Sequence, residues 1–366
     1  EEVTETTQIK WIAYSHQFFS TILIADEYFE GGHLLQQRYS EPGKYVRRYT
    51  SSIDVPFDRS GEQNIGMQLY VGPNNFKSLK GYGDMGLENV VTVGGSMIRW
   101  NNAFVVIPIF NWLNNWIDNF GIIILLLTLI IKTALFPLTF KSYKSQAVMR
   151  VLKPQVDEIG QRYPKKEDAM KKQQATMDLY KKAGANPMGG CLPMLLQFPI
   201  LYAMFRFFPT SIELRQEGFL WAHDLSTYDS ILDLPFTIPM YGDHVSLFTL
   251  LMTVTTMLSM RWNNQASAGS SAMPGMKTMM YIMPVMFMLI LNNFSAGLTY
   301  YYFLANLITL GQNLIFKQFI DEEAILKKIN AKKNKPAKKS RFAQRLADLQ
   351  KQQQRGGKSL PKKRSR

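Results

Sequence analysis

The sequence is poor in the residues on which most catalytic and metal sites depend. It has one cysteine, Cys191, which excludes an intramolecular disulfide and a cysteine-based metal cluster. Its four histidines form no zinc-binding helix motif, and no glycine-rich phosphate loop occurs. We therefore expect no enzyme: the sequence predicts no catalytic residue, no cofactor and no metal site.

Acidic residues are missing from five long apolar segments. Each segment approaches the roughly 20 residues that cross a bilayer. They lie near residues 120–140, 191–208, 245–260, 279–294 and 297–316. Five such helices in a soluble protein would leave too little polar surface to cover them. The sequence thus predicts an all-α polytopic membrane protein with a five-helix transmembrane core over residues 120–316.

Loop charges predict the orientation of this core. Segment 141–186 carries 11 Lys or Arg against five acids, whereas segment 209–244 carries one Arg against six acids. Because positive residues stay on the cytosolic side, we expect segments 141–186 and 261–277 to be cytosolic and 209–244 to be periplasmic. Residues 1–119 are then expected to lie outside, which requires an upstream signal or span missing from this chain.

The outer segment is predicted in two parts. Residues 1–95 suggest a partial β-rich periplasmic domain, because four segments have strand composition between turn residues. These are Gln8–Tyr14, Phe18–Ile24, Tyr45–Thr50 and Asn64–Val71. Residues 96–119 suggest an interfacial amphipathic helix and linker, with Phe110, Trp112, Leu113 and Trp116 on one face. An ordinary turn leading into the first span is the alternative.

Two cytosolic features complete the predicted organisation. In segment 141–186, apolar residues recur at steps of three or four on both sides of Pro164, which predicts a helical hairpin. Its expected seam contains Val148, Leu152, Val156, Ile159 and Tyr163, then Met170, Gln173, Met177 and Tyr180. Residues 317–366 hold 17 Lys or Arg against four acids, a basic tail suited to ribosomal RNA or to anionic lipid headgroups.

Lys132 is the one basic residue deep inside the first predicted span. It is residue 13 of the stretch Phe120–Phe140, about 18 Å from the outer end at 1.5 Å per residue. A lysine at this depth costs about 2.5–3.5 kcal/mol on insertion scales, so we expect it to face protein or water. Thr128 shares its face, and Gln197 lies two turns into the next span.

The last predicted span offers a polar stripe at similar depth. Its members recur at steps of three and four, so they share one helix face. They are Thr299, Tyr302, Asn306, Thr309 and Asn313. Such residues either line a wet cavity around Lys132 or form hydrogen bonds that hold the helices together, and both interpretations stay open.

Several strings resemble the YidC family of membrane-protein insertases, which is related to the mitochondrial oxidase-assembly and chloroplast insertases. The match runs in order over residues 90–316. It includes Gly121–Thr139 with Lys132, Asn186–Pro193, Leu195–Ile200, Glu213–Gln216, Trp221–Ser226 and Ser295–Leu307.

This resemblance implies a membrane-protein insertase and chaperone of the bacterial inner membrane. Its five helices would surround a hydrophilic groove, open to the cytosol and to lipid. Polar segments of nascent proteins would cross there, and their transmembrane helices would leave laterally. The chain would lack the family's first transmembrane helix and most of the periplasmic domain. The implied partners are nascent membrane proteins, the ribosome through the basic tail, the Sec translocon and membrane lipids.

The resemblance also assigns roles to single residues. The groove cation corresponds to Lys132, although many bacterial members have arginine there, which keeps the charge but removes the bidentate fork. Thr128, Leu201 and Tyr302 correspond to substrate contacts, and Gln197 corresponds to a groove-lining position. Asn306 lies on the polar stripe expected to line the same groove.

A small-solute or ion transporter that uses Lys132 as its binding site is the alternative function. The sequence shows no inverted repeat, and such a transporter has no evident use for the basic tail.

Overall fold

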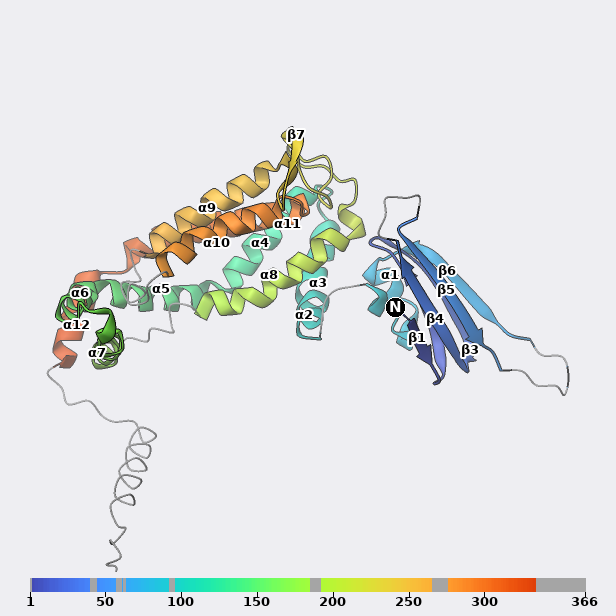
Figure 1. The fold of residues 1–366 in the computed structure, drawn as a ribbon, viewed down its shortest axis with the longest axis horizontal. Coiled ribbons are helices and arrows are strands. Elements are labelled where there is room, and N and C mark those ends of the chain that lie inside the picture. Colours follow the sequence, from blue (N-terminus) through green and yellow to red (C-terminus); the bar gives the residue numbers. More distant parts are fainter. Residues whose placement is uncertain are drawn as a thin grey trace, which may run out of the picture. The chain divides into compact units, whose positions relative to one another are not determined.

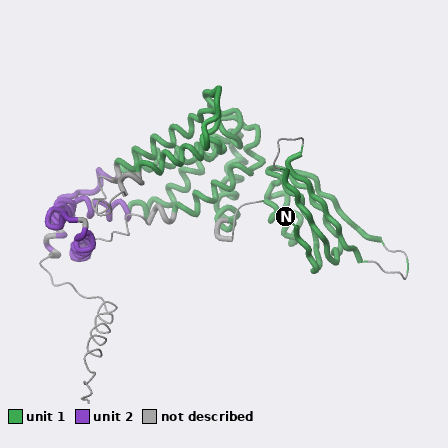
Figure 2. The backbone as a smooth tube through the Cα atoms, in the orientation of Figure 1, with its two compact units in different colours: residues 1–140, 191–263, 275–315 green, residues 141–190, 264–274, 316–366 purple. Residues whose placement is uncertain are grey.

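The computed structural model divides into two compact units (Figures 1 and 2). Unit 1 comprises residues 1–140, 191–263 and 275–315, and unit 2 comprises 141–190, 264–274 and 316–366. Within them the structure describes residues 2–39, 45–56, 61, 64–91, 96–184, 192–264 and 276–333. Cys191, most of the predicted cytosolic loop 261–277 and the tail from residue 334 lie outside the described residues.

The N-terminal part of unit 1 contains two three-stranded antiparallel sheets, in the orders β1-β4-β5 and β2-β3-β6. The strands are β1 (Glu2–Glu5), β2 (Ile9–Ser15), β3 (Phe19–Phe29), β4 (Gly31–Arg38), β5 (Arg47–Asp54) and β6 (Met67–Pro73). Side chains from both sheets pack around Ile12, Ala25 and Phe29. The four predicted strands overlap β2, β3, β5 and β6. The prediction missed β1 and β4, and β4 was hidden because its Gly31-Gly32 pair has the composition of a turn.

The rest of unit 1 is mainly helical. Its helices are α1 (Phe76–Lys80), α2 (Ser96–Asn101), α3 (Ile107–Asn114), α4 (Phe120–Ala134), the first part of α5 (Phe136–Val151), α8 (Leu192–Thr210), α9 (Leu247–Asn264), α10 (Met276–Leu291) and most of α11 (Ala296–Phe319). A two-stranded hairpin, β7 (Leu232–Ile238) and β8 (Gly242–Val245), lies between α8 and α9. Among the described residues, no single helix has both the length and the apolar character to cross a membrane; α4 and α5 meet that test only as a pair bent by 60°.

The bend between α4 and α5 differs from the sequence prediction, which treated Phe120–Phe140 as one helix. Proline has no backbone N–H, and its ring clashes with the carbonyl four residues earlier. Pro137 therefore cannot continue α4, which ends at Ala134, and instead it occupies the first turn of α5. As a consequence, Lys132 lies in the last turn of α4 rather than in the middle of a straight helix.

Helical structure precedes α4 within the segment predicted as an amphipathic helix and linker. Helical structure runs from Ser96 to Asn114, with a π-helical segment between α2 and α3. Phe110 and Leu113 are buried, but Trp112 is 58% and Trp116 is 80% exposed. At about 100° per residue, Phe110, Leu113 and Trp112 span one broad side of the helix, of which Phe110 and Leu113 pack against the protein and Trp112 is exposed.

Unit 2 contains the rest of α5, α6 (Lys153–Arg162), α7 (Ala169–Ala183) and α12 (Glu322–Lys333), with α7 packed against both α6 and α12. Its apolar cluster consists of Met149, Leu152, Val156, Tyr180, Ala183 and Ile329. Leu152, Val156 and Tyr180 belong to the predicted seam, whereas Met170 is 79% exposed. The buried residues of α7 are Thr176, Tyr180 and Ala183. Of the seam residues predicted on this helix only Tyr180 is among them, so the predicted seam was partly wrong on α7.

The helix α12 revises the prediction of a basic tail from residue 317. Its N-terminus is capped by Asp321, whose Oδ1 accepts hydrogen bonds from the amides of Glu323 and Ala324. Ile329 is buried in the cluster, and Arg150 Nε contacts Glu322 Oε1 at 3.0 Å. Residues 322–333 of the segment predicted as a basic tail therefore form a helix docked on unit 2.

We predict that Ile329→Ala releases α12 from the other helices of unit 2. Removing a buried isoleucine side chain costs about 2–5 kcal/mol, so the α12 amides are expected to exchange hydrogen faster. Leu326→Ala is the control, because Leu326 lies on the same helix but is 38% exposed. Equal exchange rates in the two variants would contradict the docking described here.

Candidate functional site

The helix α4 presents one face to the protein and another away from it. Asn119 caps its N-terminus, accepting a hydrogen bond from the Ile122 amide at 3.1 Å. The buried residues follow helical spacing: Gly121, Ile123, Ile124, Leu127, Thr128, Ile131 and Lys132. Ile122, Leu125, Leu129 and Ile130 are exposed. Helical periodicity thus places Lys132 on the inward face, one turn after Thr128.

Lys132 brings three helices together through neutral oxygen atoms. Its side chain is only 6% exposed. Its Nζ donates to Gln197 Oε1 on α8 at 3.2 Å and to Thr309 Oγ1 on α11 at 2.9 Å. The Thr309 hydroxyl in turn donates to the carbonyl oxygen of Ala305 at 2.7 Å.

The Lys132 ammonium forms no salt bridge with any residue that the structure describes. An ammonium has three donors and Lys132 uses two of them within the described residues, so its charge is oriented but not neutralised. Its position in the last turn of α4 is favourable, because unpaired helix carbonyls carry partial negative charge there.

The other candidate residues lie nearby but are not all joined to Lys132. Thr128 is fully buried, and its Oγ1 donates to the Ile124 carbonyl oxygen of its own helix at 2.6 Å. Asn306 Nδ2 donates to Thr256 Oγ1 at 2.7 Å, which links α11 to α9. Leu201 and Tyr302 are both half-buried, and Leu201 packs at the edge of the main apolar cluster.

Thr309 is the direct partner of Lys132 that sequence reasoning did not single out. It lies three residues after Asn306 on the predicted polar stripe of α11. Spacing therefore placed it on the correct face, but spacing alone could not show which stripe residue reaches the ammonium. Gln197, by contrast, was expected beside Lys132 and contacts it directly.

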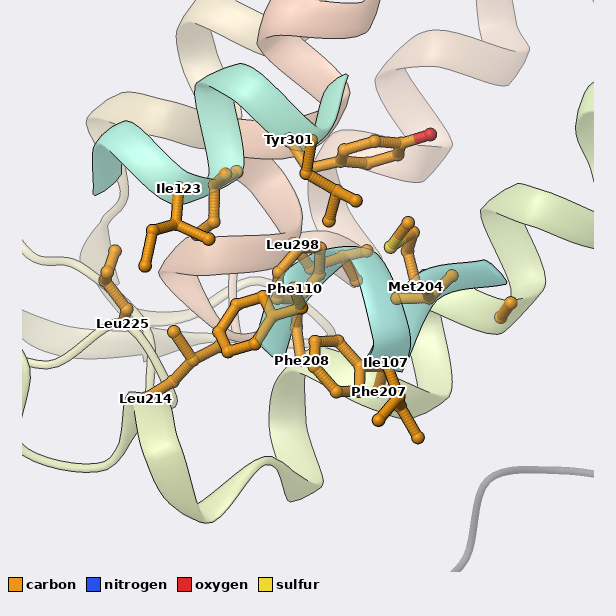
Figure 3. Close-up of a cluster of buried hydrophobic side chains, with 14 of the residues drawn as sticks. Ile107, Phe110, Ile123, Met204, Phe207, Phe208, Leu214, Leu225, Leu298 and Tyr301 are labelled. Carbon is orange, nitrogen blue, oxygen red and sulfur yellow. The ribbon is translucent and has the colours of Figure 1, made fainter. Parts of the chain in front are cut away.

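The two ends of the helical part of unit 1 differ in polarity. We call the end that carries residues 211–246 the outer end, and the opposite one the inner end. Toward the outer end, α3, α4, α8 and α11 share a dry apolar cluster (Figure 3). Its members include Ile107, Phe110, Ile123, Phe208, Leu225, Leu298 and Tyr301. Lys132, Gln197, Thr309 and Asn306 lie farther along α4, α8 and α11 from residues 211–246, where Ile131 and Ala305 of the same cluster adjoin Lys132 and Asn306.

Residues 112–323 match the family model described as the 60Kd inner membrane protein. The chain belongs to this family. Three relatives, each named membrane protein insertase YidC, confirm the resemblance found in the sequence. That of Parabacteroides distasonis is 48% identical over 359 residues, which is 95% of this chain and 57% of the relative. The relative from Bacteroides fragilis is 46% identical, and the match covers 97% of this chain and 59% of the relative. The relative from Porphyromonas gingivalis is 42% identical, and the match covers 94% of this chain and 57% of the relative.

The chain spans less than two thirds of the length of these members of the 60Kd inner membrane protein family. A solved structure described as an active YidC insertase with its first transmembrane domain resolved also matches. It is 22% identical, the match covers 85% of this chain and 75% of that chain, and the TM-score is 0.43.

We predict that Thr309→Val destabilises the protein, because the buried Lys132 ammonium would lose one of its two acceptors. Leaving a buried polar group without its partner costs about 1–3 kcal/mol. Thr133→Val, at an exposed position beside Lys132, is the matched control. Denaturant unfolding in detergent measures the free energy of unfolding of the two variants. An equal loss of stability in Thr309→Val and Thr133→Val would contradict the role given to Thr309.

Proposed function

We propose that this chain is the membrane-embedded core of a membrane-protein insertase and chaperone. One observation carries the proposal: a buried lysine in the last turn of α4 is held by neutral acceptors from two other helices, α8 and α11. A buried charge without a counter-ion is costly unless water or a passing anion completes its environment. Lys132 is therefore suited to transient contact with polar or acidic segments of a client.

The polarity difference between the two ends supports a specific route for the client. A polar backbone segment in hydrocarbon costs several kcal/mol for each unsatisfied group. A hydrophilic groove reaching Lys132 from the cytosol would shorten the dry path. Because the outer cluster around Ile123 and Phe208 is apolar and closely packed, we propose that the groove ends below it.

The client's transmembrane helix is proposed to leave sideways into lipid. Leu201 and Tyr302 are both half-buried, so they can meet an apolar client helix without disturbing the core. Burial of the client's own apolar surface in lipid supplies the driving force, so the step requires no nucleotide.

The placement in the membrane follows from the loop charges. We propose five spans in the inner membrane, with residues 1–119 periplasmic and the C-terminal tail cytosolic. The membrane localisation agrees with the family description. The names of the relatives favour insertion over the transporter alternative.

The proposed partners are nascent membrane proteins, the ribosome, the Sec translocon and lipids. Lys181 and Lys182 lie in the last turn of α7, and the sequence from residue 317 carries 17 Lys or Arg against four acids. Basic residues of this kind suit the phosphates of ribosomal RNA, and their binding weakens as salt rises.

Photocrosslinking tests the proposed path of the client. We predict that photoreactive groups at Leu201 and Tyr302 crosslink to a stalled nascent membrane protein, and that one at fully buried Thr128 does so more weakly. Leu129 is the control, because it is exposed on the outward face of α4. Adducts with lipid alone, or equal client adducts at Leu129, would count against insertion through this path.

Charge variants at Lys132 test the electrostatic step. We predict that Lys132→Arg retains insertion, whereas Lys132→Glu lowers it about tenfold or more, equivalent to about 1.4 kcal/mol. The measurement is the insertion of a client with an acidic translocated segment into proteoliposomes. Lys141→Glu, at an exposed position on α5, is the control for charge reversal. Equal activity of the two Lys132 variants would exclude the electrostatic step.

A further inference from the structure

The outer segment between α8 and α9 folds back onto the ends of the helices. The Phe219 ring lies so close to Gly121 of α4 that an added Cβ would be 2.1 Å from it. Phe219 also contacts Tyr300 of α11, with ring centroids 5.2 Å apart. Trp221 packs on Phe248 of α9 at 4.4 Å. Two neighbouring aromatic residues of the outer segment therefore contact three different helices.

A buried carboxylate holds this arrangement together. Asp229 is 2% exposed. Its Oδ2 accepts hydrogen bonds from Trp221 Nε1 at 2.9 Å and from the amides of Leu247 and Phe248 at 2.9 and 3.1 Å. Its Oδ1 accepts from Ser246 Oγ at 2.5 Å. The two amides belong to the first turn of α9, where partial positive charge favours a carboxylate.

Two further sets of bonds fasten the segment to the neighbouring helix ends. The Asn292 side chain, just after α10, accepts from the Ser246 amide and donates to the His244 carbonyl oxygen. The amide of Gly297, in the first turn of α11, donates to the Leu225 carbonyl oxygen at 2.9 Å. Through Ser246, Asp229 is thus continuous with a network that joins the start of α9 to the end of α10, while the Leu225–Gly297 bond fastens the segment to α11 separately.

We propose that Asp229 is a positioning residue that holds this outer segment closed over the helices by fixing Trp221. The inference rests on the proposed function, in which polar groups open to the cytosol require a barrier on the other side. Releasing Trp221 would free Phe219 from Gly121 and expose the dry cluster beneath, including fully buried Ile124 and Leu225. Water and ions would then have a path toward Lys132 from outside.

Thiol labelling tests this proposal without any client, so its outcome is independent of insertion activity. The parent protein is the full chain with Cys191→Ala and Ile124→Cys, and the probe is a membrane-impermeant maleimide added to the outer face of spheroplasts. We expect slow labelling of the parent. Trp221→Phe keeps an aromatic ring but loses the indole N–H, and we expect about tenfold faster labelling from the loss of a bond to a charged group. Asp229→Ala should label at least as fast.

Two further variants separate positioning from general destabilisation. Asp229→Asn keeps one accepting oxygen, so its labelling should stay within about twofold of the parent. Asp233→Ala removes an exposed acid from the same segment and should not change the rate. Thermal unfolding midpoints above the assay temperature establish that each variant is folded. The proposal would be overturned if Trp221→Phe and Asp229→Ala were both labelled at the rate of the parent. It would also be overturned if Asp229→Asn were labelled as fast as Asp229→Ala.

Discussion

The buried ammonium of Lys132 is the constraint on which the proposed function depends. Its two described partners, Gln197 and Thr309, are neutral oxygen acceptors on α8 and α11. A carboxylate in their place would neutralise the charge and make the lysine a structural ion pair. With neutral partners, the three helices meet around a charge that can still interact with another molecule.

The other helices of unit 1 are consistent with a polar segment reaching the Lys132 charge from the inner end only. Pro137 ends α4 just after Lys132, so the lysine lies in the last turn of a helix, at the bend between α4 and α5. On the other side, the apolar cluster and the outer segment held by Asp229 close the structure. A barrier at one end and polar groups toward the other are what transfer of a polar segment requires.

Helical periodicity was sufficient to predict much of the site but not its contacts. It placed Lys132 and Thr128 on one face of α4, and Asn306 and Thr309 on one face of α11, because side-chain direction repeats every 3.6 residues. It did not show that Thr309, rather than Asn306, reaches the ammonium. That choice depends on the rotation and depth of two packed helices, which local spacing does not encode.

Other features were missed for identifiable physical reasons. The prediction continued a helix through Pro137 because the apolar run was unbroken there. It treated α12 as tail because the high charge of residues 317–366 obscured the short apolar spacing that ends at Ile329. Asp229 has no periodic signature, since its four donors come from two separate stretches of chain, Trp221 and residues 246–248.

The central claim is that water reaches Lys132 from the cytosolic side, and a cysteine scan along the polar stripe of α11 tests it most directly. In a Cys191→Ala background, single cysteines at Asn313, Thr309, Asn306, Tyr302 and Thr299 would be labelled by an impermeant thiol reagent added from the cytosol. The account predicts reactivity at the first three positions, a lower rate at Tyr302 and none at Thr299. If Thr309 and Asn306 were as unreactive as Thr299, Lys132 would lie in a dry interior and the proposed route would be contradicted.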